Sequence, residues 1–142
     1  MALNYYAKEL KENAQLLASK GKGILAVDES TKTVGKRLAG IGVENTEENR
    51  KAYRGMLFTT KDLGKYISGA ILFEETLFQN HPDGEPMVKK LNDLGIIPGI
   101  KVDKGLNPLP GGNDVETFCS GLDGLVERAA KYYEQGLSLI HI

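Results

Sequence analysis

Three short runs of charged and hydroxyl-bearing residues follow three apolar segments of the sequence. The runs are Asp28-Glu29-Ser30-Thr31, Glu74-Glu75-Thr76 and Lys101-Val102-Asp103-Lys104. The apolar segments have the composition of strands buried on both faces of a parallel sheet. Enzymes built on parallel sheets bind their ligands at the carboxyl ends of the strands. All three runs therefore place ionisable groups where a ligand would bind.

Side-chain alternation along two of these strands strengthens that interpretation. Charge after a single strand is usually explained by the strand emerging into water. Asp28, however, shares its parity with Ile24, and Lys101 and Asp103 share theirs with Ile97. If that parity points into a barrel, a carboxylate and a lysine lie together inside its mouth. Such a pair can act as acid and base on a carbonyl substrate, and the lysine can also bind a phosphate.

Hydroxyl groups follow the first strand. Ser30, Thr31 and Thr33 lie between that strand and the next helix, so they offer hydroxyls and backbone N–H groups at a helix N-terminus, where anions bind readily. Serine and threonine are also favoured helix N-caps without any ligand. Both interpretations remain open on spacing alone.

Apolar periodicity predicts the elements that carry these residues. We expect strands over residues 24–27, 67–73 and 96–102, with Pro98 interrupting the pairing of the third, because proline cannot donate to a central ladder. We expect helices over residues 5–19, 34–41, 45–58, 86–94 and 120–136. Asn45 with Glu48 resembles a capping box. The residues expected to face inward are Tyr6, Leu10, Ala14, Leu17, Val34, Leu38, Ile41, Met87, Leu91, Leu94, Leu122, Leu125, Val126 and Ala129.

The alternation of strands and helices predicts an α/β protein with a parallel sheet and right-handed crossovers. An eightfold barrel allots roughly 30 residues to each unit. The sequence spacing between the starts of the second and third strands fits that figure. The spacing between the first and second strands fits it if the extra helix is an insertion. An open doubly wound sheet remains possible on pattern alone.

Composition excludes several classes of function. The 142 residues carry a net charge of −1, which favours neither nucleic acid nor an anionic membrane. No apolar run approaches the roughly 18 residues of a membrane helix, and the first residues do not form a signal peptide. Cys119, His81 and His141 are too few for a zinc cluster, so we expect no metal. The default interpretation of Lys36, Arg37, Arg50 and Arg54 is a solvated helix face, with a basic phosphate-facing group as the alternative.

Several motifs in register resemble class I fructose-bisphosphate aldolases. They are Gly23-Ile24-Leu25-Ala26-Val27-Asp28-Glu29-Ser30-Thr31 with Gly35-Lys36-Arg37-Leu38, then Glu44-Asn45-Thr46-Glu47-Glu48-Asn49-Arg50, Ile71-Leu72-Phe73-Glu74-Glu75-Thr76-Leu77, Pro98-Gly99-Ile100-Lys101-Val102-Asp103-Lys104-Gly105 and Gly121-Leu122-Asp123-Gly124-Leu125. Their order and spacing agree from about residue 3 to residue 136. Leu106 to Pro110 and Glu75 are similar to the plastid and algal branch.

The resemblance implies a lyase with a TIM (β/α)8 barrel, of which residues 1–136 hold about the first three βα units. It implies reversible cleavage of fructose 1,6-bisphosphate to dihydroxyacetone phosphate and glyceraldehyde 3-phosphate, through a lysine Schiff base and without metal or cofactor. The matching positions imply Asp28 and Lys101 as catalytic residues and Ser30 and Thr33 as phosphate-site hydroxyls. Arg37 and Arg50 match substrate-associated arginines.

The resemblance ends at residues 137–142, which form a non-matching tail that could still pair as a fourth strand. The Schiff-base lysine, the catalytic glutamate and the strand-four lysine of the family have no counterpart in this sequence. We therefore expect an N-terminal aldolase part that is inactive alone. The alternative is a non-catalytic sugar-phosphate-binding or assembly module. The family further implies a phosphorylated sugar as substrate, a homotetramer at full length, and the cytoplasm or plastid stroma as location.

Overall fold

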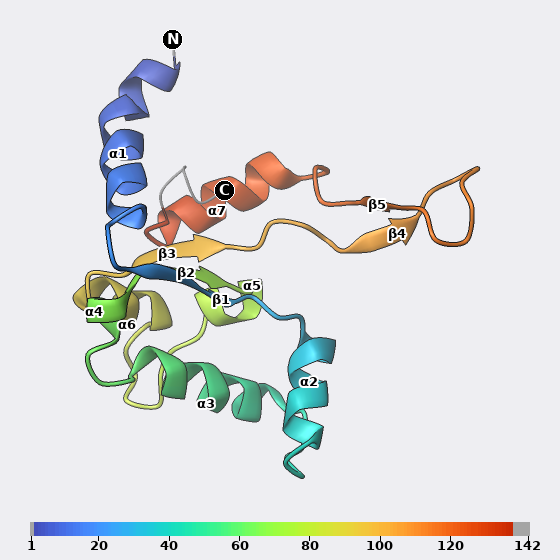
Figure 1. Ribbon diagram of the computed structural model, residues 1–142, viewed down its shortest axis with the longest axis horizontal. Coiled ribbons are helices and arrows are strands. Elements are labelled where there is room, and N and C mark those ends of the chain that lie inside the picture. The colour runs from blue at the N-terminus through green and yellow to red at the C-terminus, as the bar shows by residue number, and fades with distance from the viewer. Residues whose placement is uncertain (1, 138–142) are drawn as a thin grey trace.

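Three parallel strands form the central sheet of the structure, a computed structural model that describes residues 2–137 (Figure 1). They are β1 (Gly23–Val27), β2 (Ile67–Leu72) and β3 (Ile97–Ile100), hydrogen-bonded in the order β1-β2-β3. Both strand pairs are parallel, as the sequence predicts. The expectation of a fourth strand in the tail falls on residues 138–142, outside the described residues.

Helices connect the strands and lie around the sheet (Figure 1). In chain order they are α1 (Ala2–Leu17), α2 (Thr31–Ala39), α3 (Glu47–Phe58), α4 (Leu63–Tyr66), α5 (Glu74–Leu77), α6 (Met87–Asp93) and α7 (Leu125–Glu134). An antiparallel hairpin, β4 (Leu106–Pro108) with β5 (Thr117–Cys119), projects away from the helices. The short helices α4 and α5 and this hairpin are absent from the sequence prediction.

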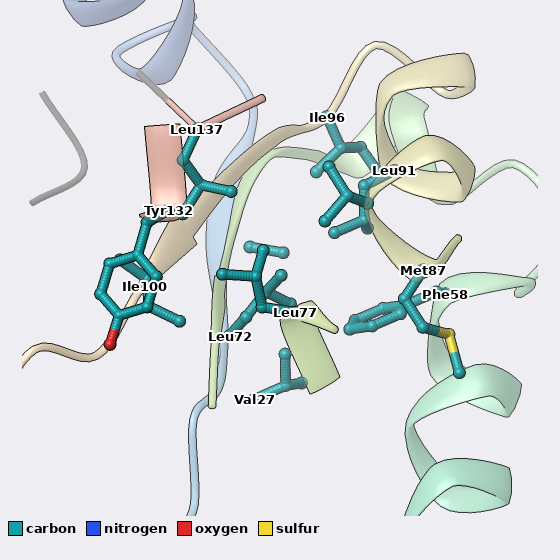
Figure 2. Close-up of a cluster of buried hydrophobic side chains, with 12 residues drawn as sticks. Val27, Phe58, Leu72, Leu77, Met87, Leu91, Ile96, Ile100, Tyr132 and Leu137 are labelled. Carbon is teal, nitrogen blue, oxygen red and sulfur yellow. The ribbon is translucent and has the colours of Figure 1, made fainter. Parts of the chain in front are cut away.

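One face of the sheet packs against the helices. The register aligns Val27 with Leu72 and Leu72 with Ile100, so these three side chains form one row across the strands. All three are buried in the main apolar cluster (Figure 2). The helices and loops contribute Phe58, Leu77, Met87, Val88, Leu91, Ile96, Tyr132 and Leu137 to that cluster. This face therefore forms the hydrophobic core.

The opposite face is open. Ile24, Gly69 and Ile97 form one row on this side, and Ile24 remains 54% exposed. A cavity of about 220 Å³ lies over the face, and Leu17 at the end of α1 forms part of its wall. A Cβ added to Gly69 would lie 2.5 Å from the Leu17 Cδ2 atom. Glycine at position 69 therefore lets α1 close one end of the sheet.

Pro98 does not interrupt the pairing of β3, contrary to the sequence prediction. The β2–β3 register runs without a break from Gly69–Ile97 to Leu72–Ile100. The Lys101 N–H donates to the Leu72 carbonyl at 2.9 Å, so odd-numbered residues of this strand bond to β2. Pro98 has the opposite parity and directs its nitrogen away from β2. Within the described residues no strand pairs with β3 on that side, so the missing N–H leaves no ladder hydrogen bond unmade.

Five residues expected to face inward are exposed, and these predictions are wrong: Ala14, Ile41, Leu94, Leu122 and Val126. Ile41 and Leu94 come after the ends of α2 and α6, and Leu122 precedes α7, so none of the three follows the helical period. Val126 lies within α7 but is 80% exposed.

The N-cap of α3 is Thr46 rather than Asn45. The Thr46 Oγ1 atom accepts a hydrogen bond from the Asn49 N–H at 3.1 Å. The Asn45 side chain is used elsewhere, because its Oδ1 atom accepts from Arg50 at 3.0 Å and its amide donates to the Thr31 carbonyl at 3.2 Å. Asn45 therefore joins two segments instead of capping one.

Candidate functional site

The side chains that follow the three strands gather at one edge of the sheet, as their positions in the sequence predict. A cavity of about 280 Å³ lies at this edge. It is lined by Ser30, Phe73, Glu74, Lys101, Asp103, Lys104 and Gly105. The residues come from the ends of β1, β2 and β3, so the cavity exists only because the strands are parallel and in this register.

Alternation places Asp28 and Lys101 on the open side of the sheet. Val27 and Ile100, which precede them, are buried in the core on the opposite side. Both Asp28 and Lys101 are half-buried. The parity inferred from the sequence therefore holds at both strand ends, and the two residues project from the same face.

Two lysines and two carboxylates line the cavity. The Lys101 ammonium pairs with the Asp103 carboxylate, which also accepts the Gly105 N–H at 3.0 Å. Lys101 holds the pKa of the Asp103 carboxyl below its ordinary value, mainly through this hydrogen bond. On the other side, the Lys104 Nζ atom lies 3.5 Å from Glu74 Oε2. Each cation is thus balanced by one carboxylate.

The hydroxyls after β1 act as a helix cap. The Thr33 N–H donates to Ser30 Oγ at 3.4 Å, and the two hydroxyl oxygens lie 3.1 Å apart. The N-cap interpretation of Ser30 is therefore confirmed. Ser30 also lines the cavity, whereas Thr33 is exposed and lies outside its lining. The hydroxyl of Ser30 is consequently the one placed to meet a ligand.

Arg50 and Arg54 are not solvated, which corrects the default interpretation of these arginines. Arg50 binds Glu75 through Nε at 2.9 Å and Nη2 at 2.5 Å. Arg54 is fully buried, and its guanidinium carbon lies 5.4 Å from the Phe73 ring centre. Burial lowers the pKa of Arg54, and the nearby Glu75 opposes that shift. The two arginines, four residues apart on α3, share one carboxylate from the end of β2.

Arg54 also holds the end of β1. Its Nη2 donates to the Glu29 carbonyl at 2.6 Å, one residue beyond Asp28. The Glu29 side chain pairs with Arg37, which donates to the Tyr53 hydroxyl at 2.9 Å. That hydrogen bond, followed by the Glu29 charge, raises the pKa of Arg37. This network connects the ends of two strands to α2 and α3.

The structure brings together some of the residues selected from the sequence and separates others. Ser30 and Lys101 line the cavity, whereas Asp28 lies outside its lining, on the side of the sheet opposite to the buried Val27. Arg37 and Arg50 are engaged with Glu29 and Glu75 outside the cavity lining.

Two of the cavity residues were visible in the sequence only as members of the strand-end runs, namely Glu74 and Lys104. Tyr132, which donates to Glu74 Oε1 at 2.8 Å, carried no local signal, because it lies 58 residues further along the chain. Sequence reasoning therefore selected the ionisable groups at the strand ends but missed the side chain that positions Glu74.

A parallel βα sheet with a charged cavity at the carboxyl ends of its strands is typical of α/β enzymes, both those with a barrel and those with a doubly wound sheet. The family model described as "Glycolytic: Fructose-bisphosphate aldolase class-I" matches residues 9–141. The chain belongs to the class-I fructose-bisphosphate aldolase family.

Relatives and a solved structure agree with this assignment. The chain is 60% identical over 131 residues to fructose-bisphosphate aldolase 3, chloroplastic, of Arabidopsis thaliana, covering 92% of the chain and 33% of that relative. It is 65% identical over 130 residues to fructose-bisphosphate aldolase 1 of Toxoplasma gondii, covering 92% of the chain and 36% of that relative. The chain thus spans about a third of the length of these relatives.

The solved structure is a Plasmodium falciparum fructose-bisphosphate aldolase in complex with TRAP and a small-molecule inhibitor. The TM-score is 0.89 at 57% identity, over 94% of this chain and 38% of that one. The fold is therefore that of the aldolase TIM barrel, and the open doubly wound alternative is excluded. Within residues 2–137, no helix has the length and apolar character needed to cross a membrane.

Proposed function

We propose that this chain supplies part of the substrate site of an enzyme that reversibly cleaves fructose 1,6-bisphosphate into dihydroxyacetone phosphate and glyceraldehyde 3-phosphate. The observation that carries the proposal is the cavity at the carboxyl ends of the strands, with Lys101 and Ser30 in its lining. Identity of 60% or more to proteins named fructose-bisphosphate aldolase supports the same substrate.

Each selected residue has a proposed role. Lys101 contacts a substrate phosphate, since an ammonium in a partly closed cavity is a strong phosphate ligand. Asp28 moves protons at the carbonyl end, and the Ser30 hydroxyl completes the phosphate site, with the Thr33 hydroxyl 3.1 Å behind it as its hydrogen-bond partner.

The two arginines have narrower proposed roles. Arg37 is exposed in the last turn of α2 and can leave Glu29 for a substrate anion. Arg50 is buried against Glu75 and Asn45, so we assign it a supporting role behind the site. A substrate phosphate would have to displace Glu75 before it reached the Arg50 guanidinium.

We propose that the 142 residues alone do not catalyse the cleavage. In the family's chemistry a lysine forms an imine with the substrate ketone, and the imine accepts the electrons of the breaking carbon–carbon bond. The lysine of that step has no counterpart in the motifs that this chain matches. Binding and turnover should therefore separate, with sugar-phosphate binding retained and cleavage absent.

Calorimetry and borohydride trapping test both halves of the proposal. We expect fructose 1,6-bisphosphate to release heat on binding to the chain, and Lys101→Ala to abolish that heat. We expect no triose phosphate and no adduct after reduction with borohydride. Turnover with a trapped adduct would contradict the predicted inactivity, whereas absence of binding would contradict the phosphate site.

The second candidate is a non-catalytic sugar-phosphate-binding module, which the intact cavity also supports. Adding the remaining two thirds of an aldolase barrel as a separate polypeptide distinguishes the two. Restored cleavage favours the enzyme part, and unchanged inactivity favours the module.

Two further proposals concern the cellular location and the oligomeric state of the whole protein. Several plant relatives are named chloroplastic, which favours the plastid stroma over the cytoplasm. A homotetramer at full length is proposed from the family resemblance alone. Fluorescence microscopy and ultracentrifugation of the full-length protein test these two points.

A further inference from the structure

The cavity contains a second lysine whose partner holds it loosely. The Lys104 Nζ atom lies 3.5 Å from Glu74 Oε2, at the outer limit of a hydrogen bond. The Lys104 side chain is 50% exposed, whereas that of Lys101 is 28% exposed and in close contact with Asp103. Of the two cations in the cavity, Lys104 is therefore the one that exchanges its partner more readily.

Glu74, by contrast, is fixed in place. Tyr132 of α7 donates to Glu74 Oε1 at 2.8 Å, and the Tyr132 side chain is buried in the core. Arg128, one turn earlier on α7, donates to the Val102 carbonyl at 3.1 Å and to the Gly121 carbonyl at 2.5 Å. The helix is thus attached to the segment after β3, and its tyrosine positions the carboxylate at the cavity wall.

The balance of charge in the cavity determines how a phosphate can bind to its lysines. Two lysines and two carboxylates cancel, so the empty cavity offers no net attraction to an anion. A phosphate group carries close to two negative charges and three acceptor oxygens at neutral pH. It can therefore replace a loosely bound carboxylate on an exposed ammonium more easily than one in close contact.

We propose that Lys104 is a second phosphate-binding lysine of the cavity, that it exchanges Glu74 for the ligand, and that Glu74 thereby sets the affinity. This inference rests on the proposed function, because it takes a sugar phosphate as the ligand. It assigns Lys104 a contact with the ligand and Glu74 a competing role. Tyr132 is a positioning residue that acts through Glu74.

Glu74 competes as a carboxylate, the ordinary form of a glutamate at neutral pH. The Tyr132 hydrogen bond further favours that form, since it is the main cause that lowers the pKa of the Glu74 carboxyl. A neutral side chain at position 74 should therefore favour the bound state. Glutamine is the suitable replacement, because its side-chain oxygen still accepts the Tyr132 hydroxyl.

The test is a calorimetric titration of the chain and its variants with three ligands: fructose 1,6-bisphosphate, inorganic phosphate and fructose. We expect Lys104→Ala to weaken binding of both phosphates about tenfold, as for the loss of one charge-assisted hydrogen bond. We expect Glu74→Gln to tighten it about threefold, which a merely structural role for Glu74 would not produce. Fructose should not bind measurably to any variant.

Lys89→Ala is the matched control. Its side chain is also 50% exposed and ion-paired, but it lies on α6 and outside the cavity. This variant should bind both phosphates within twofold of the unaltered chain. Circular dichroism of every variant checks that the fold is retained.

The outcomes separate the inference from the proposed function. If Lys101→Ala abolishes binding but Lys104→Ala leaves it within twofold, the inference is wrong and the proposed function stands. If Glu74→Gln weakens binding, the competing role of Glu74 is wrong. If the unaltered chain binds neither phosphate, both proposals fail. Binding of the bisphosphate without binding of inorganic phosphate would show that the sugar is required for recognition.

Discussion

The two faces of the central sheet are built from the same strands but meet different surroundings. On one face, Val27, Leu72 and Ile100 are almost completely buried against helices (Figure 2). On the other face, Ile24 is largely exposed, and Ile71 and Ile97 are half-buried. Both faces are apolar, as expected of strands that are covered on both sides. The comparison teaches that the outer layer of the barrel assembles locally, whereas its interior needs strands that lie far apart in sequence.

The largest test of this comparison uses two neighbouring residues of β2. Leu72→Ala should lower the free energy of unfolding by about 4 kcal/mol, because it leaves a cavity in the core. Ile71→Ala, on the open face, should lower the free energy of unfolding by about 1 kcal/mol, because the Ile71 side chain buries less apolar surface when the chain folds. Urea denaturation followed by circular dichroism measures both. Equal losses would mean that the open face is covered in solution.

The buried arginine of α3 provides the second test. Arg54→Met should lower the free energy of unfolding by about 3 kcal/mol, since breaking a buried ionic network leaves Glu29 and Glu75 with fewer partners. Arg37→Met removes an exposed guanidinium and should leave the urea midpoint nearly unchanged. A stability loss of similar size in both variants would contradict the distinction between buried and exposed arginines.

The pH dependence of stability offers the smallest expected effect. Arg50 holds the pKa of Glu75 below its ordinary value of 4.5, mainly through their hydrogen bond. A lowered folded-state pKa stabilises the fold above about pH 4.5, and this contribution is lost as the pH falls through the folded value. We expect urea midpoints to be constant from pH 7 to 5.5 and to fall below pH 4.5. In Glu75→Gln the fall should be shallower, and an unchanged slope would rule out this carboxylate as its source.

Much of the fold could be predicted from the sequence because its signals are local. Apolar runs located all three parallel strands to within two residues at either end, and alternation placed Asp28 and Lys101 on the open side. Helix ends were less certain, because a single side chain decides them. Asn45 failed as a cap since its oxygen binds Arg50 instead.

The support of the site could not be predicted for a different reason. The burial of Arg50 and Arg54 depends on Glu75, which lies 25 and 21 residues further along the chain. The position of Glu74 depends on Tyr132, which belongs to the last described helix. No periodicity within a segment indicates such pairs, because they are defined only after the strands have aligned.

Pro98 has a consequence for how molecules of this chain meet one another. Within residues 2–137, no strand pairs with the outer edge of β3 or with that of β1. An incoming chain that tried to extend the sheet at β3 would find an acceptor but no donor at Pro98, in a strand of only four residues. The addition of a further strand at the edge of β3 is therefore disfavoured at Pro98. The edge of β1, which contains no proline, is the side from which such templating would have to begin.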